Sequence, residues 1–237
     1  MRSAIPILVT ILLFCNLSGK SQDVDNQLWI NYTLKVPVTK DLSYGGDIGF
    51  RGFISNYEWN HVLVRPAITY RFNQVFAVAG AVAWFRTANR DGPNVNEFRI
   101  HQDFNLTWPD LGFMHLFYRI RIEERFFFYK EDLENSFNVR LRALIGIETQ
   151  DFTWFGKKRP IYFQGIYEAF KTLGNERAYE VFVNQVRIDF AFGHRIAKSF
   201  RYELHYIAQR SRLFSDTGLE TTQSIYRIRF YHRLGAN

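Results

Sequence analysis

Arginines and carboxylates are the residues of this chain whose types and spacing could do chemistry. They occupy alternate positions along several segments, as in Arg119, Arg121 and Glu123, with apolar residues between them. A guanidinium group carries a rigid fork of donors that matches a carboxylate or a phosphate, so such rows either form ion pairs or bind anions. The candidate residues on this charged face are Arg99, His101, Asp103, Arg119, Arg121, Glu123, Arg140, Arg142, Glu148, Arg187, Asp189, Arg201, Glu203, Arg227 and Arg229.

Two hypotheses account for these rows. The first is an internal ion-pair network, in which the acidic partners are Glu97, Asp103, Glu123, Glu148, Glu168, Asp189 and Glu203. The second is a pore selective for anions or acidic oligosaccharides, because rings of arginine select anions in other channels. Carboxylates are nearly as frequent as arginines on this face, which favours the network and leaves the pore as the alternative.

The sequence gives little support to catalysis. Outer-membrane phospholipases and lipid A deacylases carry a His-x-Ser pair, and none of the six histidines here has serine two residues later. His101 and Asp103 share a strand face and could hold a metal or act as an acid–base pair, but membership of a hydrogen-bond network is the simpler hypothesis. We therefore expect no enzymatic activity, metal or cofactor, with a lipid-modifying enzyme as a further alternative.

The elements that must position these residues are long two-faced strands. Residues 113–125 and 136–148 alternate strictly between apolar and polar side chains, which is the period of a β-strand. Eleven such segments can be traced between Leu28 and Arg233. Short connectors are expected near Lys40, Asn73, Asp110, Lys157 and Lys198, and longer ones near Asn56, Asp91, Lys130, Gly174 and Asp216. This rhythm is typical of an antiparallel up-and-down outer-membrane barrel with short periplasmic turns and longer external loops.

The strand count is left open at 10 or 12. Single-chain bacterial barrels have an even number of strands, whereas eleven segments are visible. Either one strand escapes the pattern, or the segment from Leu28 to Val36 lies outside the barrel wall.

Orientation decides between a membrane barrel and an exported soluble β-barrel or sandwich, such as a lipocalin-like domain. The segments run for about 10 to 13 residues, longer than the strands of most soluble sheets. Aromatic residues recur near the strand ends, as in the girdles of membrane barrels; they are Tyr32, Phe50, Tyr70, Trp84, Trp108, Phe126 and Tyr226. Arginine also outnumbers lysine, 22 to 8. We therefore expect the apolar faces to point outward at lipid and the charged faces to point into the lumen.

The N-terminal residues have the layout of a secretory signal peptide. Arg2 precedes a short apolar run, Ala4 to Phe14, and Gly19-Lys20-Ser21 gives a small-x-small cleavage site. The expected organisation is a signal peptide at 1–21 and one barrel domain at 22–237. Cys15 would permit a lipoprotein, but bulky Phe14 before it disfavours lipidation. We expect the mature chain to lie in the bacterial outer membrane.

The net charge of +7 is modest and is spread through the alternating segments. A nucleic-acid partner is not expected, because nucleic-acid-binding surfaces usually concentrate their basic residues in one patch. The expected partners are outer-membrane lipid and small anionic solutes, and the sequence does not indicate a protein partner.

Three segments carry a family resemblance. Residues 96–104, 118–126 and 138–142, with their alternating Arg and Glu side chains, resemble an uncharacterised family of bacterial outer-membrane proteins known as a domain of unknown function. The resemblance covers most of the chain after the signal segment. It implies a barrel of similar length in the outer membrane, and it brings no established activity or catalytic residues.

Overall fold

The computed structural model describes residues 25–54, 59–90, 92–109, 111–130, 134–153, 159–173, 185–211 and 221–235. The expected signal peptide at 1–21 lies outside these residues, as do Lys157 and Lys158. Within the described ranges, no helix has the length and apolar character needed to cross a membrane.

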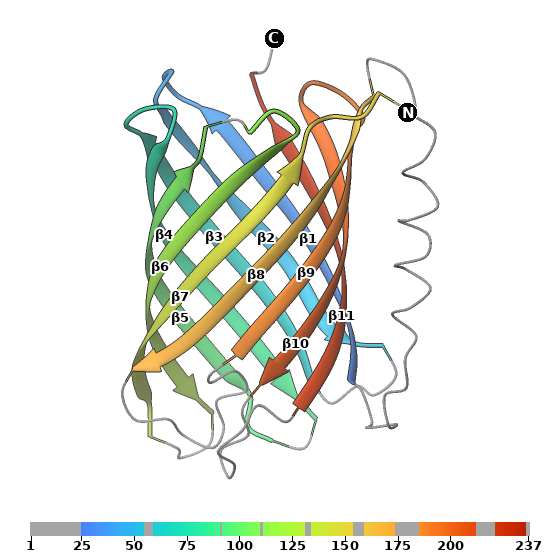
Figure 1. The fold of residues 1–237 in the computed structure, drawn as a ribbon. Helices are drawn as coiled ribbons and strands as arrows, with labels where there is room; N and C mark the ends of the chain where they lie inside the picture. Colours follow the sequence, from blue (N-terminus) through green and yellow to red (C-terminus); the bar gives the residue numbers. More distant parts are fainter. Residues whose placement is uncertain are drawn as a thin grey trace.

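Eleven strands in the described ranges form one closed barrel (Figure 1). Their bounds are β1 Asp25–Pro37, β2 Leu42–Phe53, β3 Trp59–Arg71, β4 Phe76–Asn89, β5 Val95–Thr107, β6 Met114–Tyr129, β7 Ser136–Thr149, β8 Ile161–Leu173, β9 Gln185–Arg195, β10 Phe200–Ser211 and β11 Thr221–Arg233. Each strand pairs with its neighbours in sequence, which confirms the predicted all-β, up-and-down architecture.

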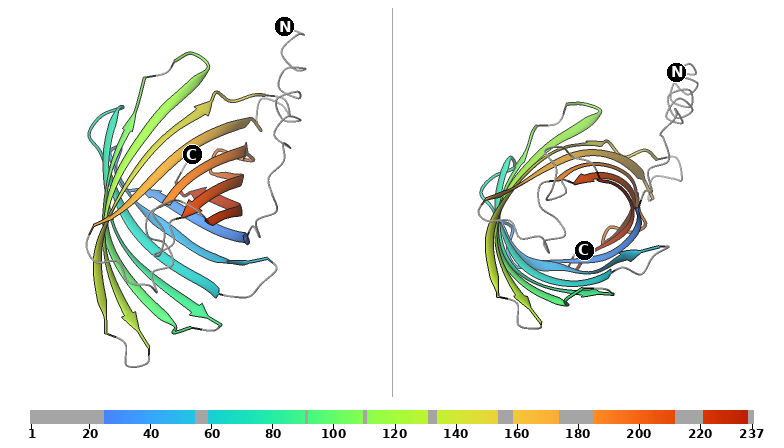
Figure 2. Two further views of the ribbon diagram at one scale, coloured as in Figure 1. Left: turned by 60° about the horizontal axis from the view of Figure 1, so that its bottom comes forward. Right: turned by 90° about the horizontal axis from the view of Figure 1, so that it is seen from below.

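The closure of the barrel corrects the expected strand count. The described chain has eleven strands, neither 10 nor 12, and β1 is part of the wall. An odd number places the first and last strands in the same direction, so β1 pairs with β11 in parallel while the other neighbouring pairs are antiparallel. The parallel register brings Trp29 opposite Arg227. Figure 2 shows the resulting ring of strands end on.

Alternation along each strand separates an apolar outer face from a polar inner face. On β6, the side chains of Ile120 and Ile122 are 49% and 37% exposed, whereas Arg121 and Glu123 between them are 5% and 1% exposed. Successive side chains of a strand point to opposite faces, so one register decides the orientation of the whole strand. The predicted orientation, apolar outward and charged inward, is confirmed.

The outer face carries a band of apolar residues bordered by charge on one side. The charged residues that point outward from the described strands are Arg86, Glu124, Lys171 and Arg210, and each lies in the last six residues of its strand. All four strands run towards the end of the barrel that carries the connections β2–β3, β4–β5, β6–β7, β8–β9 and β10–β11. We call this the loop end and the opposite one the turn end, at the bottom and top of Figure 1.

The connections alternate in length less regularly than the sequence predicted. Residues 38–41, 72–75 and 196–199 form short connections at the turn end, as expected. However, residues 150–160 at the same end separate β7 from β8 by as much as residues 174–184 separate β8 from β9 at the loop end. The short connector expected near Lys157 is therefore wrong in length.

Glycine provides room for a large side chain inside the wall. A methyl group at position 193 would collide with the ring of Tyr162, which covers the Gly193 backbone. Tyr162 is fully buried, and its hydroxyl donates to Oε1 of Glu203 at 2.5 Å. The missing side chain on β9 thus lets a tyrosine on β8 reach a carboxylate on β10.

Candidate functional site

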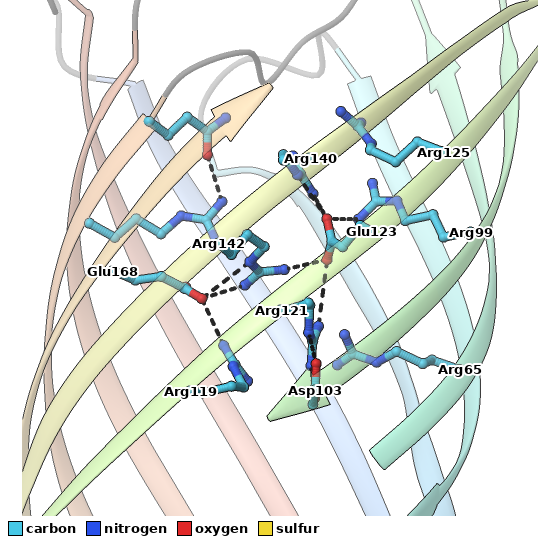
Figure 3. A network of polar contacts seen from close by, with 12 residues as sticks. Arg65, Arg99, Asp103, Arg119, Arg121, Glu123, Arg125, Arg140, Arg142 and Glu168 are labelled. Carbon is cyan, nitrogen blue, oxygen red and sulfur yellow. Dashed lines mark hydrogen bonds and ion pairs between the residues drawn. The ribbon is translucent and has the colours of Figure 1, made fainter. Parts of the chain in front are cut away.

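Buried ion pairs join strands β5 to β8 inside the lumen (Figure 3). The simplest pair lies directly across two strands: Arg121 on β6 faces Asp103 on β5 and donates through Nε at 2.5 Å and through Nη2 at 2.7 Å. Both side chains are buried, and the fork of the guanidinium matches the two carboxylate oxygens. This pair places Asp103 in a network of lumen side chains, the simpler of the two hypotheses for this residue, and its direct partner is an arginine.

Glu123 is the centre of the network in Figure 3. Its carboxylate lies 2.6 Å from Nη2 of Arg140 and 2.8 Å from Nη1 of Arg142. Arg121 and Arg99 approach it at 3.6 Å and 3.9 Å. One carboxylate that is 1% exposed therefore faces four guanidinium groups.

Carboxylates also stabilise arginines that face each other across neighbouring strands. Arg99 on β5 lies opposite Arg125 on β6, an arrangement of like charges that is destabilising by itself. Oε1 of Glu97 accepts from Nε of both guanidinium groups, at 2.5 Å and 2.6 Å. In the same way Arg121 faces Arg142, and each has its own carboxylate partner.

Glu168 extends the network across a strand. Its Oε1 accepts from Nη2 of Arg142 at 2.8 Å and from Nη2 of Arg119 at 2.7 Å. Arg119 belongs to β6 and Glu168 to β8, so this contact bridges two strands that do not pair with each other. Such diagonal contacts hold the inner face together independently of the backbone ladder.

A second polar cluster lies on β9 to β11. His205 contacts Asp189 through Nδ1 at 2.8 Å and Glu203 through Nε2 at 3.1 Å. Arg227 donates to Oδ2 of Asp189 at 2.7 Å, and Tyr162 donates to Glu203. The imidazole is thus enclosed by carboxylates and an arginine.

The structure places the candidate residues on the inner face as follows. Those within the β5–β8 network are Arg99, Asp103, Arg119, Arg121, Glu123, Arg140 and Arg142. Those in or beside the β9–β11 cluster are Asp189, Glu203, Arg227 and Arg201, the last of which lies 3.7 Å from Glu203. Glu148 pairs with Arg195 near the turn end. His101 is buried on β5, and Arg187 and Arg229 line the central cavity described next.

A chamber lies between the two clusters, and all eleven described strands line it. Its volume is about 150 Å³. Eleven arginines of the described chain line the chamber; they are Arg51, Arg65, Arg99, Arg119, Arg121, Arg125, Arg140, Arg142, Arg187, Arg227 and Arg229. Six carboxylates line it or pair with one of these arginines: Asp47, Glu97, Asp103, Glu123, Glu168 and Asp189. Among the described residues, the arginines of the chamber therefore outnumber these carboxylates by five.

Three arginines of the chamber have no carboxylate within ion-pairing distance among the described residues. Arg51 lies over the Trp29 ring, with Cζ 4.2 Å from the ring centre, and its Nε is buried without a hydrogen-bond partner. Arg187 donates to the amide oxygens of Gln209 and Gln185 at 2.5 Å and 3.1 Å. Arg229 has one long hydrogen bond, 3.4 Å, to the hydroxyl of Thr33.

Several of these residues are absent from the candidates that the sequence supplied. Arg51, Arg65 and Arg125 occupy inward positions of the same alternating pattern, so the period-two signal was sufficient to include them. Trp29 could not have been selected, because an aromatic residue at an inward position has no charge to mark it.

A vestibule of about 550 Å³ lies towards the turn end. Small residues of β2 to β4 line it, among them Gly45, Ala77 and Ala79. The chamber and the vestibule share five lining residues: Asp47, Arg65, Arg119, Arg121 and Arg229. The partition between the two spaces therefore consists of side chains, including the Arg65–Asp47 ion pair at 2.6 Å.

The chemistry of this site is that of anion binding and charge pairing. Across the described part of the chain, no group of three or more His, Cys, Asp or Glu residues is placed to hold a metal ion. The charged groups of the chamber are mostly permanent cations, which bind anions and do not transfer protons at ordinary pH.

A family model matches residues 26–220, which include β2 to β10 completely and all of β1 except Asp25. The chain belongs to the family described as Protein of unknown function (DUF2490). No curated protein and no solved structure matches the chain. The resemblance predicted from residues 96–104, 118–126 and 138–142 is confirmed as membership of a family of unknown function, and the barrel fold that it implied is the one observed.

Proposed function

We propose that this protein is a non-enzymatic outer-membrane β-barrel whose lumen is closed by ion pairs. The observation that carries the proposal is the reversed polarity of the barrel. Exposed side chains such as Ile48, Ile68 and Phe190 cover the outside, while Glu123 and Arg125 are 1% and 2% exposed inside. A soluble barrel would bury its apolar face, so this arrangement supports a hydrocarbon surrounding.

The outer face fits a bilayer in its details. Aromatic side chains are exposed near the strand ends, as in Tyr44 and Tyr70 near the turn end and Trp84 and Tyr226 nearer the loop end. Outward charges occur only close to the loop end of the described strands, which leaves an uncharged band between that level and the turns. Membrane barrels have such a band, about 25 Å tall, between aromatic girdles.

The ion-pair network of strands β5 to β8 crosses the interior of the barrel, and this supports the proposal that the lumen is closed. Arg142 bridges Glu123 and Glu168, and Arg119 continues to the partition on the turn-end side of the chamber. The aromatic side chains of Trp29, Trp59 and Phe85 are buried on the loop side of the same space. Charged and aromatic groups together occupy the section that an open channel would leave to water.

The absence of enzymatic activity is part of the proposal. The histidine in the most polar surroundings, His205, contacts two carboxylates and an arginine, and a hydrolase would need it to face a hydroxyl nucleophile. Incubation of the purified barrel with labelled phospholipid and lipid A should give no product. Release of a labelled fatty acid would favour the lipid-modifying alternative.

An anion-selective porin is the second candidate function. The excess of arginine in the chamber favours it over a cation channel. Planar-bilayer recording separates the two candidates: we expect a folded sample to show no single-channel steps. Anion-selective steps that disappear in Arg121→Ala and Arg142→Ala variants would replace the closed barrel with the porin.

Location is tested separately. Cell fractionation should recover the protein in the outer membrane, and the purified protein should migrate differently on a gel before and after heating. Recovery in the periplasm without detergent would establish an exported soluble protein.

A further inference from the structure

We infer that the chamber is a binding site for a small divalent oxyanion. Arg51, Arg187 and Arg229 hold the anion. Phosphate and dicarboxylate groups share the required chemistry, which is two or more oxygens that carry negative charge. The inference depends on the barrel interior alone and goes beyond the proposed function, which concerns the membrane and the closure of the lumen.

The first argument is the charge balance. Among the described residues, eleven arginines and six carboxylates surround or support this one space, and three of these eleven arginines have no ion-pair partner there. Placing a charge in a buried site without a counter-ion is strongly unfavourable. An anion in the chamber would provide the compensation that the described side chains lack.

The second argument is that the side chains around the site are held in position. Arg51 and Arg187 both lie over the Trp29 indole, with Cζ at 4.2 Å and 5.1 Å from its centre. Trp29 is itself fixed, because its Nε1 donates to Gln27 at 2.9 Å and only 1% of the side chain is exposed. A guanidinium group stacked on an aromatic face still presents its edge to hydrogen-bond acceptors. Arg187 uses two of its five N–H groups for Gln209 and Gln185, which leaves the others for a ligand.

The strand register brings the third arginine close. Trp29 lies opposite Arg51 on β2 and opposite Arg227 on β11, while Asn31, two residues on, lies opposite Arg229. Arg229 therefore points inward one step from the row that contains Arg51. Arg227 is already paired with Asp189, so it contributes less to a ligand.

Size and access fit a small anion. A volume of about 150 Å³ is well above the roughly 10–15 Å³ that a cavity needs to hold one water molecule, so the chamber has room for a tetrahedral or dicarboxylate group. The vestibule provides the approach from the turn end, because it shares Arg229 and the Asp47–Arg65 pair with the chamber. Movement of that pair would admit the ligand.

The test is isothermal titration calorimetry of the detergent-solubilised full chain with inorganic phosphate and, separately, succinate, in chloride buffer. We expect one divalent anion per barrel. Arg51→Gln and Arg187→Gln should each weaken binding about tenfold or more, since a hydrogen bond to a charged group contributes at least that factor. Arg86→Gln is the matched control, because it removes the same charge from the outer face of β4 and should leave the affinity unchanged.

Failure to bind either anion would overturn the inference, as would binding that is unchanged in the Arg51→Gln and Arg187→Gln variants. If a glutamine variant does not fold, Arg51→Lys and Arg187→Lys keep the charge but lose the fork, and they should bind more weakly than the original chain. Equal binding by the lysine variants would also contradict the site. The assay needs no membrane, so its outcome is independent of fractionation and conductance.

Discussion

The two sides of the chamber use the same residue type in opposite ways. On strands β5 to β8, arginines such as Arg121 and Arg140 form close ion pairs with Asp103 and Glu123. On strands β2, β9 and β11, Arg51, Arg187 and Arg229 stack on aromatic rings or donate to neutral groups, whereas Arg227 on β11 is paired with Asp189. We call the β5–β8 network the paired side and the three arginines Arg51, Arg187 and Arg229 the unpaired side. The difference teaches that a row of arginines in a sequence does not reveal whether its charge is already balanced.

The largest loss of stability should come from removing the charge of Glu123, which is the centre of the paired side. Glu123→Gln leaves Arg140 and Arg142 without their closest shared carboxylate, so the free energy of unfolding should fall by about 3–5 kcal/mol. Urea unfolding in detergent micelles or vesicles measures it. The control is Glu124→Gln, which removes the same charge from the adjacent, outward position of β6. An equal loss in both variants would contradict the inward placement of the network.

Arginine substitutions on the two sides sharpen the comparison. Arg121→Gln leaves Asp103 buried without its partner and should cost about 3 kcal/mol. Arg51→Gln in anion-free buffer should change the stability by less than about 1 kcal/mol, or increase it, because it removes a buried charge that has no ion-pair partner. Thermal unfolding of both variants provides the measurement. A large loss in Arg51→Gln would mean that the two sides are equally balanced.

A smaller loss of stability should follow from a substitution where β8, β9 and β10 meet. Gly193→Ala forces the Tyr162 ring away from β9 and weakens its hydrogen bond to Glu203, at a cost of about 1–3 kcal/mol. Gly80→Ala is the matched control, since no neighbouring atom lies within 4 Å of a methyl group there. The midpoint of urea unfolding should shift for the first variant only, and equal midpoints would show that Tyr162 does not need this space.

Much of this architecture could be predicted from alternation alone. The period of two along residues 113–125 and 136–148 was sufficient to place β6 and β7 and to assign their faces, because a strand has only two faces. The eleven segments match the eleven strands, but the alternation does not show how the barrel closes, since that depends on whether β1 meets β11 in parallel or antiparallel pairing. That choice involves residues about 200 positions apart, and no local pattern reports it.

Some ion-pair partners could likewise be predicted from the sequence, and others could not. Asp103 and Arg121 are direct cross-strand neighbours, so consecutive strands in register suggest their contact. The contact between Arg119 and Glu168 spans a strand that lies between them, and it depends on side-chain length and strand stagger. That Arg51 has no ion-pair partner among the described residues is still harder to predict from the sequence. It depends on the positions of all the carboxylates around the chamber.

Tryptophan fluorescence tests the orientation of the two faces most directly. Trp84 points outward and is 43% exposed, whereas Trp29 is 1% exposed and lies inside against Arg51. Two variants, each retaining one of these residues and carrying phenylalanine in place of every other tryptophan, would be reconstituted into vesicles of brominated phospholipid. Strong quenching of Trp84 with little quenching of Trp29 is the result that we predict. Strong quenching of Trp29 with an unquenched Trp84 would contradict an apolar face in lipid and a charged face in the lumen.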